Sequence, residues 1–140
     1  MLYLDTSLLV AALSKEAKTA VVHAWLESQS SDRLAISDWV VTEFSAALPI
    51  KQRTGHIDAA DRAGALAAFA RLCAESLTTL PVSTLHFRTA ARLADQHSLG
   101  LRAADALHLS VCADSGATLN TLDRRLSEAG SLLGVATVLL

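Results

Sequence analysis

The stretch that decides the fold is MLYLDTSLLVAAL, residues 1–13, in which one carboxylate, Asp5, lies between two apolar runs. The apolar residues 2–4 predict a short buried strand. The leucines and valine that follow Asp5 are typical of the core face of a helix, which we expect from Thr6 to about Ser14. Asp5 is therefore expected where a strand ends and a helix begins.

The rest of the chain alternates short apolar segments with longer helical patterns. Further strands are expected at RLAIS (33–37), LTTLPV (77–82), ATLNT (117–121) and VATVLL (135–140). Helices are expected over 17–28, over 58–76, from about Arg102 to Asp114, and over 124–129. Two more are expected to begin at a cap: one at Asp38, with a kink or end near Pro49, and one at Thr84, which ends at Gly100. On the helix that starts at Thr84, residues Phe87, Ala91 and Ala94 share one face.

Helices of this length between strands imply right-handed crossovers, which make the strands mostly parallel. We therefore predict a single three-layer α/β domain over residues 1–140, with a mostly parallel central sheet of four to five strands flanked by helices. Hydrophobic residues make up 51% of the chain and aromatic residues only 4%, which favours packed helices over a β-sandwich.

Composition also limits the classes of function. No apolar run approaches the roughly 18 residues of a membrane span. Asp5 interrupts the only candidate for an export leader, so we expect a cytoplasmic protein without membrane contact. A formal net charge of −2 predicts that any contact with nucleic acid is local. Cys73 and Cys112 lack metal-ligand spacing and are expected to be buried free thiols.

Four acidic residues are placed so that they can converge on one edge of the sheet. Asp5 and Asp123 follow predicted strands, whereas Glu43 and Asp105 lie on helices of the connections. Ligands of open parallel sheets bind at the carboxyl ends of the strands. Clustered carboxylates repel one another unless a cation lies among them, and oxygen ligands suit Mg²⁺ or Mn²⁺. The pattern thus predicts a divalent metal site.

Each of these acids also has a purely structural interpretation. Asp5 and Asp123 can cap the helices that follow them. Asp105 can be a first-turn acid favoured by the helix dipole, or a partner of Arg102, and Glu43 can be a solvated helix residue. The hypothesis of a site depends on the four acids occurring together.

Four segments resemble, in chain order, the acidic motifs of the PIN-domain ribonucleases, and VapC-type toxins of toxin-antitoxin pairs in particular. The segments are YLDTSLLVAAL, VVTEFSAAL, LRAADALHLS and LNTLDRRL. The resemblance covers essentially the whole chain, and RAADALHL is its most specific part. It implies that the catalytic, metal-binding residues are Asp5, Glu43, Asp105 and Asp123, with Thr121 as an accompanying hydroxyl.

The resemblance also implies the activity and the partners. We expect an endoribonuclease that hydrolyses RNA with water activated by Mg²⁺ or Mn²⁺, a homodimer, and a cognate antitoxin that binds over the acidic groove. Ser7, Arg102 and Arg124 are candidate substrate contacts near the motifs. Asn120 is an alternative to Thr121, and His108 either touches the site or packs in the core. The Ala-rich segment 61–76 is a candidate dimer surface.

Two functions of other classes remain open. An aspartate-nucleophile phosphatase would also begin with an acid after the first strand, but it needs a second acid two residues later, where this chain has Ser7. A catalytically silent PIN-fold module, acting in a repressor complex, is expected to have lost one or more acids, and all four are present.

Overall fold

In the computed structural model, which describes residues 1–140, short strands alternate with helices along the chain. The strands are β1 (Leu2–Leu4), β2 (Leu34–Ser37), β3 (Thr78–Leu80), β4 (Thr118–Thr121) and β5 (Thr137–Leu139). The α-helices are α1 (Thr6–Leu13), α2 (Thr19–Glu27), α3 (Asp38–Arg53), α4 (Ala59–Glu75), α5 (Thr84–Ala94), α6 (Ala103–Ser115) and α7 (Arg124–Leu132). Two short 3₁₀ turns, Ser31–Arg33 and His97–Leu99, complete the path.

The five strands form one parallel sheet in the order β3-β2-β1-β4-β5. The chain builds one side of the sheet outward from β1 to β2 and β3, then returns to β4 on the other side of β1. The order of the strands therefore reverses between β1 and β4, which is where parallel sheets bind their ligands. The predicted three-layer α/β fold is confirmed, with five strands.

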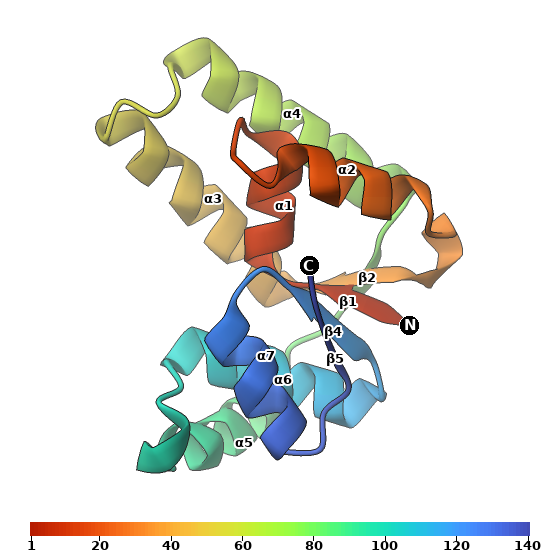
Figure 1. Ribbon diagram of the computed structural model, residues 1–140, viewed down its shortest axis with the longest axis vertical. Coiled ribbons are helices and arrows are strands. Elements are labelled where there is room, and N and C mark those ends of the chain that lie inside the picture. Colours follow the sequence, from red (N-terminus) through yellow and green to blue (C-terminus); the bar gives the residue numbers. More distant parts are fainter.

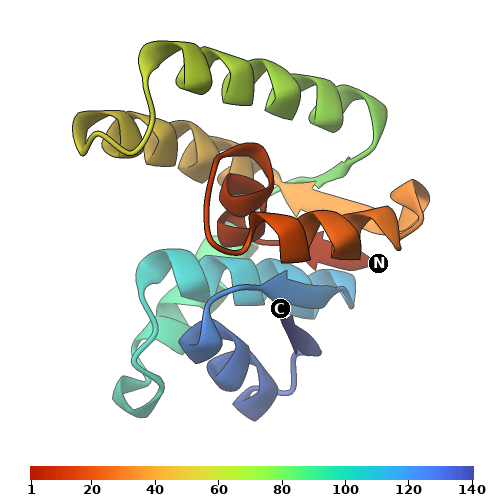
Figure 2. The ribbon, with the colours of Figure 1, turned by 45° about the horizontal axis from the view of Figure 1, so that its top comes forward.

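Helices cover both faces of the sheet. Figure 1 shows α1 to α4 on one face and α5 to α7 on the other, and the turned view in Figure 2 keeps this division. Large side chains that are completely buried, such as Tyr3 and Leu119 from the sheet, form the core with Phe44 and Leu109 from opposite helical layers. The rings of Phe44 and Phe69 stack with centroids 4.2 Å apart and join α3 to α4.

Helix α3 differs from the sequence prediction at both ends. Ser37 occupies the N-cap position, and Asp38 is the first helical residue and not the cap. The helix also continues through Pro49 to Arg53. A proline this close to the end of a helix removes one hydrogen bond, and the fully buried Leu48 keeps that turn packed against the core.

Helices α5 and α7 also differ from the prediction. Ser83 caps α5 in place of Thr84: its hydroxyl accepts the His86 amide hydrogen, and His86 Nδ1 accepts the Ser83 amide hydrogen. The helix ends at Ala94, short of the predicted end, and a 3₁₀ turn leads to Gly100. Helix α7 extends to Leu132, three residues beyond the predicted end, and only Gly130 of these three is buried.

Three smaller expectations have separate outcomes. Cys112 is buried as predicted, Cys73 is only partly buried, and both thiols are free. None of the helices combines the length and apolar composition that a bilayer span requires. Residues Phe87, Ala91 and Ala94 do share one face of α5, but Phe87 is 53% exposed, so that face is not part of the core.

Two glycines test the packing of the helical layers. A Cβ at Gly130 in α7 would lie 2.5 Å from Thr137 Cγ2 and 2.9 Å from Leu109 Cδ2, whereas a Cβ at Gly64 in α4 meets nothing within 4 Å. We expect Gly130→Ala to lower the free energy of unfolding by about 1–3 kcal/mol through overpacking. Gly64→Ala should raise it by up to about 1 kcal/mol. Urea denaturation measures both, and equal effects would contradict the tight contact of α7 with β5.

Candidate functional site

Asp5 lies between the carboxyl ends of the two central strands, and its side chain is 4% exposed. Its amide hydrogen is donated to Asn120 O, at the end of β4. Carboxylate atom Oδ1 accepts hydrogen bonds from the Ser7 hydroxyl at 2.6 Å and the Leu8 amide at 3.1 Å, and Oδ2 accepts one from the Thr121 hydroxyl at 2.6 Å. Asp5 therefore caps α1 and also joins β1 to β4.

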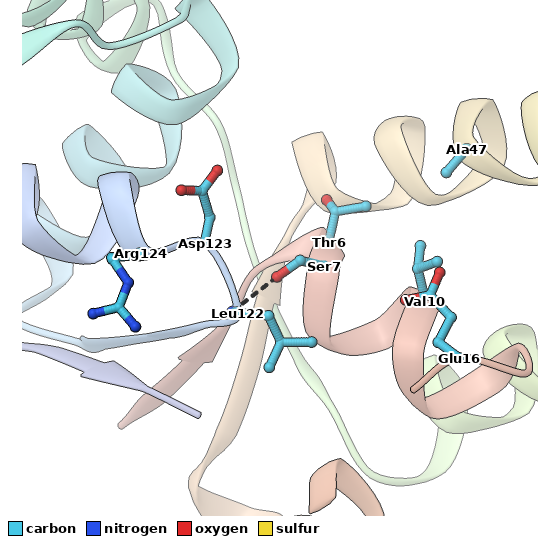
Figure 3. A pocket seen from close by; sticks show the side chains of 8 residues that line it. All are labelled: Thr6, Ser7, Val10, Glu16, Ala47, Leu122, Asp123 and Arg124. Carbon is cyan, nitrogen blue, oxygen red and sulfur yellow. Dashed lines mark hydrogen bonds between the residues drawn. The ribbon is translucent and has the colours of Figure 1, made fainter. Parts of the chain in front are cut away.

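The same two hydroxyls fasten the turn that follows β4. Thr121 Oγ1 accepts the Asp123 amide hydrogen at 2.9 Å, and Ser7 Oγ accepts the Leu122 amide hydrogen at 3.0 Å, a contact drawn in Figure 3. Asp123 caps α7 by accepting the Leu126 amide hydrogen at 3.1 Å. Ser7 and Thr121 thus connect the first and fourth predicted acids through one network.

Glu43 reaches the same region from α3. Its Oε2 atom accepts hydrogen bonds from the Thr6 hydroxyl at 2.6 Å and from His108 Nε2 at 2.7 Å. Thr6 is the residue after Asp5, so this bond connects Glu43 of α3 to the first turn of α1. The role of His108, left open by the sequence, is now defined, because the ring is buried and bonded to a predicted site residue.

Asp105 stands apart from this network. In the first turn of α6 its Oδ2 atom accepts the Arg102 amide hydrogen at 3.0 Å. Of the two structural interpretations of Asp105, the first-turn acid is found, whereas the Arg102 side chain forms no ion pair with it: the nearest cationic group is Arg125 Nη2, 3.9 Å away on α7. The structural role foreseen for Asp105 is present, and its proposed catalytic role remains a prediction.

The four acids approach the same edge without closing into one cluster. No group of three or more His, Cys, Asp or Glu side chains is close enough to hold a metal ion. The donor chemistry nevertheless fits Mg²⁺ or Mn²⁺, because carboxylate and hydroxyl oxygens meet beside Asp5. Asp5 is almost fully buried and forms no salt bridge with a Lys, Arg or His. An uncompensated buried carboxylate is the environment that a cation stabilises.

Asp5 and Glu43 differ in their protonation. Burial raises the pKa of Asp5 above its ordinary value of 3.8, and the hydrogen bonds from Ser7 and Thr121 only partly offset this. Burial also acts to raise the pKa of Glu43, but the hydrogen bond and charge of His108 and the Thr6 hydroxyl outweigh it, so that the pKa is lowered. Glu43 is therefore the readily ionised acid, and Asp5 is the acid whose charge lacks compensation.

A groove of about 640 Å³ opens next to Asp123, which is the only one of the four acids that lines it. It is lined by Thr6, Ser7, Val10, Glu16, Ala47, Leu122, Asp123 and Arg124. In Figure 3, Asp123 and Arg124 lie on one side of the groove, and α1 and Ala47 of α3 lie on the other. Arg124 is exposed there, whereas Arg102 is exposed but does not line the groove.

Sequence analysis missed Thr6, Tyr3 and Ser37 as members of the network. The Tyr3 hydroxyl lies 2.8 Å from His108 Nδ1 and 2.7 Å from Ser37 Oγ. The only available signal was position, since Ser37 ends a strand and Thr6 adjoins Asp5. Asn120, the alternative to Thr121, donates Nδ2 to the backbone oxygens of Tyr3 and Thr118, and its buried Oδ1 has no hydrogen-bond partner. Its part in the site remains a prediction.

Comparisons with known proteins place this geometry in context. The model of one protein family, the PIN domain, matches residues 2–132. None of the curated proteins matches the chain.

Solved structures share the fold at low identity. VapC20 of Mycobacterium tuberculosis, a toxin that cleaves the sarcin-ricin loop, is 21% identical with a TM-score of 0.75, covering 93% of this chain and 95% of that one. FitAcB of Neisseria gonorrhoeae is 19% identical, with a TM-score of 0.71 and coverages of 98% and 96%. VapBC2 of Rickettsia felis, bound to a fragment of its promoter DNA, is 19% identical, with a TM-score of 0.68 and coverages of 100% and 99%.

The raised pKa of Asp5 predicts a pH dependence of stability in the absence of metal. Because the folded protein holds this proton more tightly than the unfolded chain, the contribution of Asp5 to stability falls as pH rises above 3.8. Asp5→Asn does not titrate and should gain stability relative to wild type as pH increases towards neutrality. Urea denaturation in EDTA from pH 4.5 to 8 measures the difference, and parallel pH profiles would contradict the raised pKa.

Proposed function

The chain belongs to the PIN domain family, and from that premise we propose that it is an endoribonuclease that depends on a divalent metal ion. The proposed ion is Mg²⁺ or Mn²⁺, and the proposed ligands are the carboxylates of Asp5, Glu43, Asp105 and Asp123, with Thr121 supporting the first of them. The observation that carries the proposal is the buried Asp5, which lies at the switch point between β1 and β4 and forms no salt bridge.

Different residues of the site would have different roles in phosphodiester hydrolysis. A bound divalent ion supplies a Lewis acid for the phosphate and an activated water. Ser7 and Thr121 orient both oxygens of Asp5. Glu43 is held ionised by His108, and the exposed Arg124 adds positive charge at the rim of the groove, where RNA phosphates would pass. Arg102 is a further proposed phosphate contact outside the groove.

We also propose that the enzyme is the toxin of a toxin-antitoxin pair. The similarity to VapC20 and to VapBC2 supports this class, as do the motifs of the sequence. A segment of the cognate antitoxin would bind over the groove, with an arginine reaching the carboxylates. The direct test is genetic: a small protein encoded by the adjoining reading frame should relieve the growth arrest that this chain causes.

The two alternative functions find less support. The Ser7 hydroxyl donates to Asp5 Oδ1, so the position that needs a second acid in an aspartate-nucleophile phosphatase instead orients the first acid. For a catalytically silent binding module, the retention of four acids and of a buried network around two of them would have no purpose.

We propose that the protein is a homodimer and place the contact on α5 and α6. An entirely apolar hollow of about 210 Å³ is lined by Trp39, Phe87, Ala90, Ala91, Ala94, Ala103 and Leu107. Phe87 and its neighbour Leu85 are 53% and 58% exposed. The Ala-rich helix α4, the surface expected from the sequence, exposes no large hydrophobic side chain. Exposed apolar area therefore favours the hollow.

The dimer surface can be tested with two charged substitutions. Phe87→Asp places a carboxylate beside the hollow and should convert the protein to a monomer at micromolar concentration, because a buried unpaired charge is costly. Ala67→Asp, at an exposed position of α4, should leave the dimer intact. Light scattering coupled to size-exclusion chromatography measures both. If Ala67→Asp alone is monomeric, the dimer contact lies on α4. If the wild type is monomeric, the proposal of a dimer is wrong.

The function itself is tested most simply at Asp105. Asparagine can still accept the Arg102 amide hydrogen, so loss of the cap and of the weak contact with Arg125 should cost at most about 1 kcal/mol. If Asp105 binds the metal, Mn²⁺-dependent cleavage of a mixed RNA pool by Asp105→Asn should fall by at least about a hundredfold. In EDTA the free energy of unfolding of the variant should stay within about 1 kcal/mol of wild type, because Asp105 contacts only the Arg102 amide and Arg125.

Asp114→Asn is the matched control, because Asp114 lies on the same helix and bonds only His86. This variant should cleave RNA at the wild-type rate. Undiminished cleavage by Asp105→Asn would overturn the proposed mechanism, and a variant that does not fold would restore the purely structural interpretation of Asp105.

A further inference from the structure

We propose that His108 is a positioning residue that, with the Tyr3 hydroxyl behind it, fixes one oxygen of Glu43 so that the other oxygen is presented to a cation. The inference rests on the proposed function, because it gives Glu43 the role of a metal ligand. It assigns His108 and Tyr3 no contact with substrate or metal.

A buried chain of side chains leads from the sheet to Glu43. Ser37 Oγ lies 2.7 Å from the Tyr3 hydroxyl, which lies 2.8 Å from His108 Nδ1, and His108 Nε2 lies 2.7 Å from Glu43 Oε2. These residues belong to β2, β1, α6 and α3, so the chain spans both helical layers. Ser37 and Tyr3 are fully buried, and His108 is 3% exposed. The imidazole is held at both nitrogens in a place that water does not reach.

The direction of the bond to Glu43 follows from its charge. In the proposed role Glu43 is a carboxylate, which can only accept hydrogen bonds, as it does from the Thr6 hydroxyl. His108 Nε2 therefore carries the hydrogen. A hydroxyl can either donate to Nδ1 or accept from it, so the Tyr3 hydroxyl completes the second bond of the ring. The second bond fixes the orientation of the imidazole and hence of its Nε2–H.

Both donors to Glu43 converge on one oxygen. The Thr6 hydroxyl and His108 Nε2 bond Oε2 at 2.6 and 2.7 Å, and no hydrogen bond of normal geometry reaches Oε1. The buried indole N–H of Trp39, which has no other partner, lies near enough to the carboxylate to help lower the pKa of Glu43. The glutamate side chain is 22% exposed, in contrast to the buried histidine. The flexible Glu43 side chain is thus held through Oε2, and Oε1 is the oxygen that would coordinate the cation. Partners that orient a ligating carboxylate typically change metal affinity by about 10- to 100-fold when they are removed.

The chain contains its own control for a buried histidine bonded to a carboxylate. His86 is 8% exposed, its Nδ1 accepts the Ser83 amide hydrogen, and its Nε2 lies 3.1 Å from Asp114 Oδ2. It bonds none of the proposed site residues. Loss of either histidine should destabilise the fold, but only loss of His108 should affect Glu43.

The experiment is a Mn²⁺ titration of the full chain, with free Mn²⁺ measured by electron paramagnetic resonance. His108→Leu should raise the Mn²⁺ dissociation constant at least about tenfold, and Tyr3→Phe should raise it less. His108→Gln, whose amide nitrogen can replace Nε2 as a donor, should recover most of the affinity. His86→Leu should lower the melting temperature in EDTA and leave the dissociation constant unchanged. In a Glu43→Gln background, His108→Leu should cause no further loss.

Each outcome separates this inference from the proposed function. Unchanged Mn²⁺ affinity of folded His108→Leu, or an equal loss in His86→Leu, would overturn the positioning role alone. If His108→Leu does not fold, the Mn²⁺ affinities of His108→Gln and Tyr3→Phe are compared. The positioning role predicts that His108→Gln binds Mn²⁺ more tightly than Tyr3→Phe does, and the reverse order would overturn it. A wild type that binds no Mn²⁺, or an Asp5→Asn variant that binds it equally well, would overturn the proposed function and this inference with it.

Discussion

The hydrogen bonds that enter the buried carboxylate of Asp5 are the constraint on which the rest of this structure depends. Donors from Ser7 and Leu8 start α1, and the donor from Thr121 ties β1 to β4 at the point where the strand order reverses. The same carboxylate is desolvated and forms no salt bridge. One residue thus stabilises the local geometry by its hydrogen bonds and opposes stability by its buried charge, a conflict that natural sequences retain mainly at functional sites.

The order and type of the elements could be predicted because each depends on local patterns. Leu2–Leu4 and the apolar spacing after Asp5 specify a strand and a helix without knowledge of the rest of the chain. The ends of α3 and α5 could not be predicted, because they depend on tertiary burial of Leu48 and on a reciprocal cap in which His86 replaces the acid that usually completes it. The solvent exposure of Phe87 on α5 could not be predicted either, because periodicity identifies an apolar face but does not show what covers it.

The sequence predicts which acidic residues belong to the candidate site, but it does not predict which side chains they contact. Asp5 and Asp123 could be placed together because they end neighbouring strands of a parallel sheet. The bond between Glu43 and His108 joins residues 65 positions apart, and no local pattern reports it. Arg102 illustrates the opposite error: its closeness to Asp105 in sequence suggested an ion pair, whereas the helix cap uses its backbone amide and Arg125 of α7 supplies the nearby charge.

The activity proposed for this protein requires that the acidic edge of the sheet bind a divalent cation through Asp5. The most direct measurement is the anomalous scattering of Mn²⁺ in crystals of the wild-type protein, compared with crystals of Asp5→Asn grown in the same solution. We predict a strong anomalous peak within coordination distance of the Asp5 carboxylate in wild type and its loss in the variant. A peak that persists in Asp5→Asn, or Mn²⁺ bound only at exposed acids such as Asp58 and Asp61, would contradict the claim.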